Sequence, residues 1–289
     1  MIGAIIGDMV GSLYEGNNVK DKRIPFLTKY SYPTDDSIMT IAISRALSEF
    51  QTGYGRVGIP SECEEEFYNA CVKYMDIYGN KYRDAGYGSR FSAWLDADVK
   101  KPYNSWGNGS AMRVSAVGWY AETLEDALRI AKITAETTHN HPEGIKGAQA
   151  IAAGVFMLRT GSTKEEVKEY IEETFEYDLS RKLDDIRPEY TFHVSCQKSV
   201  PEAIIAFLES TSFEDAIRNA VSIGGDSDTI ACMAGALAEA YYPIPREILD
   251  SALENIKSIG TFTDRDFGFY NSLVISRKGN DRINETFEL

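Results

Sequence analysis

The spacing of apolar residues constrains the fold of this chain most, because it is helical almost everywhere. Between Asp36 and Phe50, apolar residues recur at three- and four-residue steps with polar residues between them, which is the pattern of a helix that buries one face. Eight further stretches carry a similar stripe: 63–75, 123–137, 143–158, 164–175, 201–208, 213–223, 229–241 and 246–256. We therefore predict an all-α fold.

Other local signals agree with that prediction. Ser61, Ser162 and Ser212 stand where helix N-caps are expected, each followed by acidic residues. Strand-like composition is confined to 23–30 and 188–195, which are short and bounded by proline or polar residues. The sequence has no internal repeat and no linker long enough to separate two domains, so we predict a single domain over residues 1–289.

Charge and composition exclude several classes of protein. The 289 residues include 30 Lys and Arg against 44 Asp and Glu, a net charge of −14, so neither nucleic-acid nor membrane-surface binding is expected. No apolar run is long enough for a membrane span. The first residues are apolar but lack the basic start of a signal peptide, which predicts a cytoplasmic protein. The four cysteines form no CxxC pair and are expected to be reduced thiols.

Two acidic breaks between helices carry the most chemical information. Thr34, Asp35 and Asp36 begin one predicted helix, and Asp226, Asp228 and Thr229 follow a Gly-Gly pair at the start of another. A helix cap explains the first group well when it is taken alone. The second has two carboxylates at i and i+2 and a hydroxyl next to the second, which is more than a cap requires. Oxygen-only ligands favour Mg²⁺, Ca²⁺ or Mn²⁺, and the two groups together could hold two ions.

Two further polar breaks are candidates for ligand binding. The glycines of 104–113 could bring backbone N–H groups to a phosphate, although an ordinary Gly-Asn turn explains the same residues. The segment has neither a Walker nor a Rossmann pattern. His139, in Thr-Thr-His-Asn-His-Pro, could bond a phosphate or ribose, or simply the backbone at a helix start.

Taken together, these motifs resemble the ADP-ribosylglycohydrolase family, which includes dinitrogenase reductase activating glycohydrolase and the ADP-ribosylhydrolases. The matching segments, in order, are Gly3–Asp8 with Gly11–Glu15, Thr34–Asp36, Gly107–Arg113, Thr138–His139 and Gly224–Thr229. The resemblance spans nearly the whole chain. It implies a compact orthogonal helical bundle with a central dinuclear metal site.

The resemblance also implies roles for individual residues. The metal ligands would be Thr34, Asp35, Asp36, Asp226, Asp228 and Thr229, holding two divalent cations, Mg²⁺ or Mn²⁺. Glu15 would lie near the metals as a ligand or base. The loop residues Gly107, Asn108, Gly109 and Ser110, together with His139, would contact the diphosphate and riboses of ADP-ribose.

The expected activity is hydrolysis of the N- or O-glycosidic bond between ADP-ribose and an acceptor, which is a protein side chain or a small conjugate. Asp35, Asp36 and Glu15 are the candidate bases, and the sequence does not choose among them. Two alternatives stay open at this point. One is a dinuclear metal phosphohydrolase with the same carboxylates, and the other is a non-catalytic ADP-ribose-binding or structural protein of the same fold.

Overall fold

The computed structural model describes residues 1–54, 58–260, 262 and 266. The polar stretch 277–288, which the sequence suggests is loosely held, lies outside them. Within these residues the chain is helical, as predicted. They contain no β-strand, only an isolated antiparallel bridge between Gly107 and Ser195. The longer helices are α1 (Ile2–Gly11), α2 (Asp35–Tyr54), α3 (Glu64–Lys81), α7 (Leu124–Glu136), α8 (Pro142–Arg159), α9 (Lys164–Phe175), α11 (Cys196–Leu208), α12 (Phe213–Val221), α13 (Ser227–Tyr241) and α14 (Arg246–Ile259). The shorter elements are η1 (Ser61–Cys63), α4 (Ser89–Asp96), α5 (Gly109–Met112), α6 (Ser115–Tyr120) and α10 (Leu183–Ile186).

All nine predicted helical stretches coincide with helices, but the ends differ by a few residues at several of them. The cap at Ser212 is confirmed, since its side chain accepts a hydrogen bond from the Asp215 N–H. The cap predicted at Ser162 is displaced by one residue, because Thr163 forms the capping box with Glu166. Ser61 lies inside the short η1 turn and is not a cap. Helix α1 was not predicted, because its residues are buried all round and leave no polar face to reveal a period.

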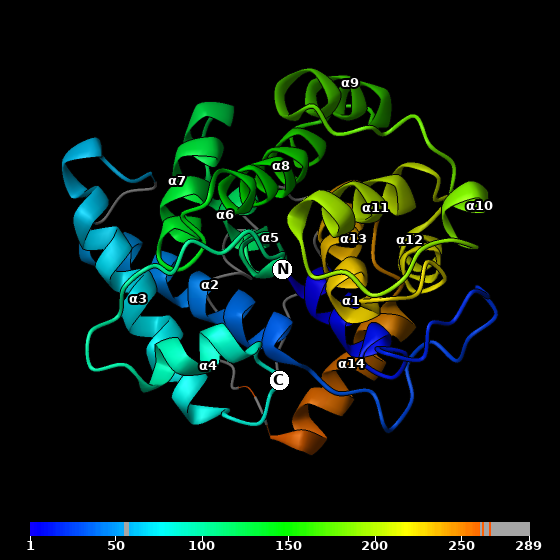
Figure 1. Cartoon of the computed structure of the whole chain (residues 1–289), viewed down its shortest axis with the longest axis horizontal. Coiled ribbons are helices and arrows are strands. Elements are labelled where there is room, and N and C mark those ends of the chain that lie inside the picture. The colour runs from blue at the N-terminus through cyan, green and yellow to red at the C-terminus, as the bar shows by residue number, and fades with distance from the viewer. Residues whose placement is uncertain (55–57, 261, 263–265, 267–289) are drawn as a thin grey trace.

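Helices α1 and α13 lie side by side at the centre of the bundle (Figure 1) and are covered by α2, α8, α11 and α12. Their close approach depends on small residues. A Cβ on Gly7 would lie 2.0 Å from the Ala231 carbonyl oxygen, and one on Gly11 would lie 2.4 Å from the Asp228 Cα. Gly3 meets Gly235 in the same way. Glycines four residues apart therefore form a flat face on α1, which fixes that helix against the start of α13.

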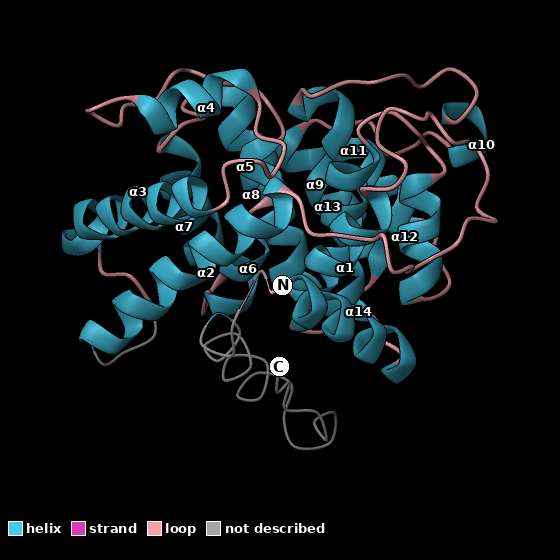
Figure 2. Cartoon of the chain, turned by 90° about the horizontal axis from the view of Figure 1, so that it is seen from below, coloured by secondary structure: helices cyan, strands magenta, loops and turns pink. Residues whose placement is uncertain are grey.

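The connections that carry the polar motifs gather on one side of the bundle. Figure 2 shows loops crossing between α4 and α11 above the central helices. The starts of α2, α5 and α13 face this region, so motifs far apart in sequence meet there. Among the described residues, no helix combines the length and the apolar character that crossing a bilayer requires. The four cysteines are free and buried, as predicted.

Candidate functional site

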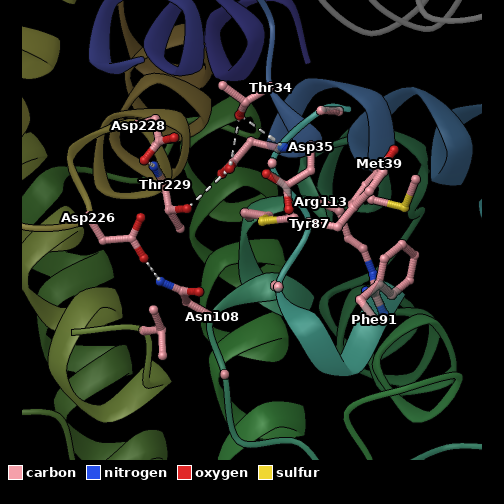
Figure 3. A pocket seen from close by; sticks show the side chains of 18 of the residues that line it. Thr34, Asp35, Met39, Tyr87, Phe91, Asn108, Arg113, Asp226, Asp228 and Thr229 are labelled. Atoms are coloured by element: carbon pink, nitrogen blue, oxygen red, sulfur yellow. Dashed lines mark hydrogen bonds between the residues drawn. The ribbon is translucent and has the colours of Figure 1, made fainter. Parts of the chain in front are cut away.

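A pocket of about 520 Å³ opens among these connections, a volume that suits a small-molecule ligand. It is bounded by the starts of α2 and α13, by the loop that ends at Gly109, and by the segment 84–91 before and within α4. Figure 3 shows Asp226, Asp228 and Thr229 on one side and Tyr87, Phe91 and Arg113 on the other. Every predicted metal ligand lines this pocket.

The first acidic group is held in place by α1. Asp8 on that helix accepts hydrogen bonds from the Thr34 N–H at 2.8 Å and from the Thr34 hydroxyl at 2.7 Å. It also accepts from the N–H and the hydroxyl of Ser37. Asp36 is 1% exposed, and its Oδ2 accepts from the Thr229 hydroxyl at 3.1 Å. This bond joins the start of α2 to the start of α13.

The second acidic group depends on the two glycines before it. Gly224 and Gly225 have φ values of +77° and +69°, the left-handed region that glycine adopts without a steric penalty. A Cβ on Gly225 would lie 2.7 Å from the Thr191 carbonyl oxygen. The turn brings Asp226 and Asp228 into the pocket, where both are buried. The Gly-Gly pair therefore makes the tight turn that positions both carboxylates.

The carboxylates form two groups of three that share Asp228. One consists of Asp8, Asp36 and Asp228, and the other of Glu15, Asp226 and Asp228; within each, one oxygen per residue lies within 4.8 Å of the others. Asp36 Oδ1 is buried and has no hydrogen-bond donor. A buried, unpartnered carboxylate oxygen among other carboxylates lacks a positive partner, and an oxygen-only donor set suits Mg²⁺ or Mn²⁺. The residues therefore fit divalent cations.

Crowding of negative charge is visible in the acid–base properties. Burial, followed by the charges of Asp8, Asp226 and Glu15, raises the pKa of Asp35 to about 8. Burial and the Asp228 charge raise the pKa of Asp36 well above its ordinary range, and burial and Asp226 do the same for Asp228. The carboxylate cluster is thus costly to ionise in the absence of cations.

Glu15 reaches the cluster from the loop after α1. The loop is anchored to the turn before α13, since the Lys20 ammonium donates to the carbonyls of Tyr190 and Ile223 at 2.7 and 2.6 Å. The Asn18 side chain accepts from the Gly225 N–H at 3.3 Å. Glu15 itself is exposed, and burial of part of its side chain, with the nearby Asp226 charge, raises its pKa.

The glycine-rich loop lines the same pocket as the carboxylates. Gly107, Asn108 and Gly109 line it, whereas Ser110 is fully buried and donates its hydroxyl to the Gly144 carbonyl at 2.7 Å. The Asn108 side chain points toward the acidic cluster, where its Nδ2 donates to Asp226 Oδ2 at 2.7 Å (Figure 3). The structure therefore gives Asn108 a contact with a predicted metal ligand, which the motif alone did not suggest.

His139 packs against this loop and is joined to a buried arginine. Its Nδ1 lies 2.7 Å from the Thr138 hydroxyl, which accepts a hydrogen bond from Arg113 at 2.9 Å. A Cβ on Gly109 would lie 3.2 Å from His139 Nε2, so that nitrogen is on the loop side. Burial, together with the charges of Arg113 and Arg90, holds the pKa of His139 well below its ordinary value. This shift favours the neutral imidazole.

Several residues of the site were missed in the sequence. The matching motifs contain Asp8 and Arg113, but the sequence assigns a function to neither. It also gives no indication that the segment 84–91 and Tyr103 line the pocket. The four-residue glycine spacing of α1 was a usable signal, since it places Asp8 one position after Gly7 on a helix destined for close packing. Nothing in the spacing indicated that 84–91 would reach the pocket, because that contact is purely tertiary.

Several known proteins resemble this chain in sequence or in fold. The chain is 26% identical to the protein named ADP-ribosylhydrolase ARH3 from Homo sapiens, with 84% of each chain covered. It is 27% identical to a putative ADP-ribosyl glycohydrolase, L543, from Acanthamoeba polyphaga mimivirus, covering 88% of this chain and 89% of that one. A solved structure titled ADP-ribosylglycohydrolase-related protein complex has the same fold, with a TM-score of 0.66, 20% identity, and coverage of 93% and 94%.

The family comparison covers almost all of the described residues. The sequence model of the ADP-ribosylglycohydrolase family matches residues 1–273, a span that contains both acidic groups, the glycine-rich loop and His139. The resemblance noted in the sequence is confirmed. This chain belongs to the ADP-ribosylglycohydrolase family.

Proposed function

We propose that this protein is a metal-dependent hydrolase that releases ADP-ribose from an acceptor by cleaving the glycosidic bond at C1″ of the distal ribose. The observation that carries the proposal is that one pocket is lined both by residues of the two carboxylate groups that share Asp228 and by the glycine-rich loop with His139. The relatives named ADP-ribosylhydrolase support the same substrate class.

The proposed cation ligands are the two acidic helix starts. Thr34, Asp35, Asp36, Asp226, Asp228 and Thr229 would hold two divalent cations, Mg²⁺ or Mn²⁺. When bound, such cations polarise a water molecule and bind ribose hydroxyls near the scissile carbon. The carboxylates are preorganised for this role by the neighbouring bonds, since Asn108 orients Asp226 and the Thr229 hydroxyl orients Asp36.

We assign the general base to Glu15. Asp36 is 1% exposed and is committed to the bond that joins α2 to α13, so it is poorly placed to exchange a proton with pocket water. Glu15 is exposed at the pocket wall, and its raised pKa brings its basicity closer to that needed near neutral pH. Asp35, which belongs to neither group of three, would bond a ribose hydroxyl in addition to ligating a cation.

The part of the pocket that the glycine-rich loop and His139 line would receive the diphosphate. Backbone N–H groups of the glycine-rich loop and the His139 Nε2–H are the donors in this proposal. The Thr138 hydroxyl accepts from Arg113 and can donate its own proton to His139 Nδ1; we propose this tautomer, in which the imidazole proton is on Nε2. The buried Arg113 guanidinium adds positive charge to the pocket. This charge would offset the repulsion that a net charge of −14 exerts on an anionic ligand.

The test is release of ADP-ribose from four substrates: ADP-ribosyl-arginine, ADP-ribosyl-serine, O-acetyl-ADP-ribose and ADP-ribosylated DNA. Each is assayed with Mg²⁺, with Mn²⁺ and with a chelator. We expect release from at least one substrate that the chelator abolishes, and loss of turnover in Asp226→Asn and Asp228→Asn. Glu15→Gln should lower kcat by 10²-fold or more while cation binding persists. Unchanged turnover in Asp228→Asn would refute the metal assignment, and phosphate release without ADP-ribose release would favour a phosphohydrolase.

A further inference from the structure

One carboxylate of the acidic cluster already accepts hydrogen bonds from the protein on both of its oxygens. Asp8 lies on α1 and is 0% exposed. Its Oδ1 accepts from the Thr34 hydroxyl, and its Oδ2 accepts from the Thr34 N–H and from both the N–H and the hydroxyl of Ser37. Oδ2 thus receives three donors and Oδ1 receives one, so hydrogen bonds within the protein already use most of the roughly four lone-pair positions of this carboxylate.

Asp36, in the same group of three, has the opposite character. Its Oδ1 is buried without a donor, and its Oδ2 has the Thr229 hydroxyl at 3.1 Å. An oxygen without a donor can accept a cation, whereas an oxygen filled with N–H and O–H donors cannot do so without losing them. The two carboxylates of this group therefore have different tasks, although they lie within 4.8 Å of the same third residue, Asp228.

The bond from Thr34 to Asp8 also decides which side of the threonine hydroxyl faces the pocket. That hydroxyl has one proton, and its shortest contact is with Asp8 Oδ1 at 2.7 Å, against 3.4 Å to Asp36 Oδ2. A hydroxyl ligates a cation through a lone pair. One lone pair accepts from the Asp36 N–H at 3.4 Å. With its proton held by Asp8, Thr34 can present its other lone pair to the pocket that it lines.

We propose that Asp8 is a positioning residue that fixes the direction of the Thr34 hydroxyl and the start of α2, and thereby prepares Thr34 as a cation ligand without binding a cation itself. This inference rests on the cation site of the proposed function. It requires Asp8 to act through Thr34, so the two side chains should be coupled in cation affinity.

The Asp8→Asn substitution tests this coupling. An asparagine amide nitrogen placed at the Oδ2 position would meet three hydrogen-bond donors, whereas at the Oδ1 position it would meet only one. The nitrogen should therefore take the Oδ1 position, next to the Thr34 hydroxyl. The amide then donates to the Thr34 hydroxyl, whose proton must turn elsewhere, including toward the cation. Substitutions of residues that orient metal ligands typically cost about 10- to 100-fold in metal affinity.

The experiment is calorimetric titration of the full chain with Mg²⁺ alone, and separately with Mn²⁺ alone. Wild type is compared with Asp8→Asn, Thr34→Val, the double variant and Ser37→Ala. We expect at least tenfold weaker binding in Asp8→Asn and in Thr34→Val, with no further loss in the double variant. Ser37→Ala removes a donor to the same carboxylate but leaves the Thr34 bond, so its affinity should stay within about twofold of wild type.

Three outcomes would overturn the proposal. Equal affinity of wild type and Asp8→Asn would show that Asp8 does not orient a ligand. A further tenfold loss on adding Asp8→Asn to Thr34→Val would show that Asp8 binds the cation directly. If Asp8→Asn does not fold by circular dichroism, unchanged affinity in Thr34→Val is sufficient to refute it. Cation binding by wild type without release of ADP-ribose from any substrate refutes the proposed activity and leaves this inference standing.

Discussion

Replacing Asp36 by asparagine should make the cation-free protein more stable while removing its response to cations. The side chain is 1% exposed and its Oδ1 has no donor, so an amide nitrogen at that position breaks no bond. The remaining oxygen can still accept from the Thr229 hydroxyl. The substitution therefore deletes a charge from a crowded cluster with little change of shape.

The size of the effect follows from the spacing of the carboxylates. The carboxylate oxygens lie within 4.8 Å of one another, and at that distance two ionised oxygens repel by about 3.5 kcal/mol at an effective dielectric constant of about 20. Partial protonation of the cluster relieves some of this repulsion, so we expect a gain of about 1–3 kcal/mol in the free energy of unfolding. Burial and Asp228 raise the pKa of Asp36, so the wild-type protein loses stability as the pH rises above the ordinary carboxyl range. The gain should be larger at pH 8 than at pH 5.

The assay is denaturant unfolding of wild type and Asp36→Asn at both pH values, in chelator and in Mg²⁺. At a Mg²⁺ concentration of about 100 times its Kd, wild type should gain about 2.7 kcal/mol, and Asp36→Asn should gain almost nothing. Thr40→Ser, on the same helix one turn along and outside the pocket lining, serves as a control that keeps the wild-type Mg²⁺ response. If Asp36→Asn is less stable than wild type in chelator, or keeps the full Mg²⁺ response, the reasoning is wrong.

Three other predictions concern the packing of α1, the charge state of His139 and the contacts of Lys164. Gly7→Ala should lower the free energy of unfolding by about 1–3 kcal/mol through overpacking, because its Cβ would lie 2.0 Å from the Ala231 oxygen; an unchanged denaturation midpoint would contradict the helix contact. Burial lowers the pKa of His139 well below its ordinary value, so this residue should not titrate between pH 6 and 8. ADP-ribose affinity, measured by titration over that range, should therefore show the same pH dependence in wild type and in His139→Gln. Lys164→Met should cost about 1–3 kcal/mol in thermal unfolding, because its ammonium donates to carbonyl oxygens at the end of α11.

Sequence periodicity predicted all of the longer helices of the described residues except α1. The stretch 164–175 is an example, since its predicted bounds match α9. The same signal failed for α1, whose residues are all buried. A helix surrounded by other helices needs no polar face, so this signal is weaker there, although it still identified α13, which is also buried almost throughout.

The candidate ligands were also identifiable in the sequence, because oxygen-rich residues at helix starts, next to a Gly-Gly pair, have few structural uses. Their arrangement was not. The sharing of Asp228 between two carboxylate groups, and the Asn108 contact with Asp226 across 118 positions of sequence, depend on which loops meet.

The sequence by itself therefore determined the helical class, the residue types of the site and the family. Only the tertiary structure decided which oxygens are free and which are engaged. Asp8 and Asp36 are both buried aspartates in one cluster, yet four donors occupy the first and an oxygen of the second has none. The difference arises because α1 is fixed by its glycines against α13 and meets the start of α2 there, and no local pattern records such a contact between distant segments.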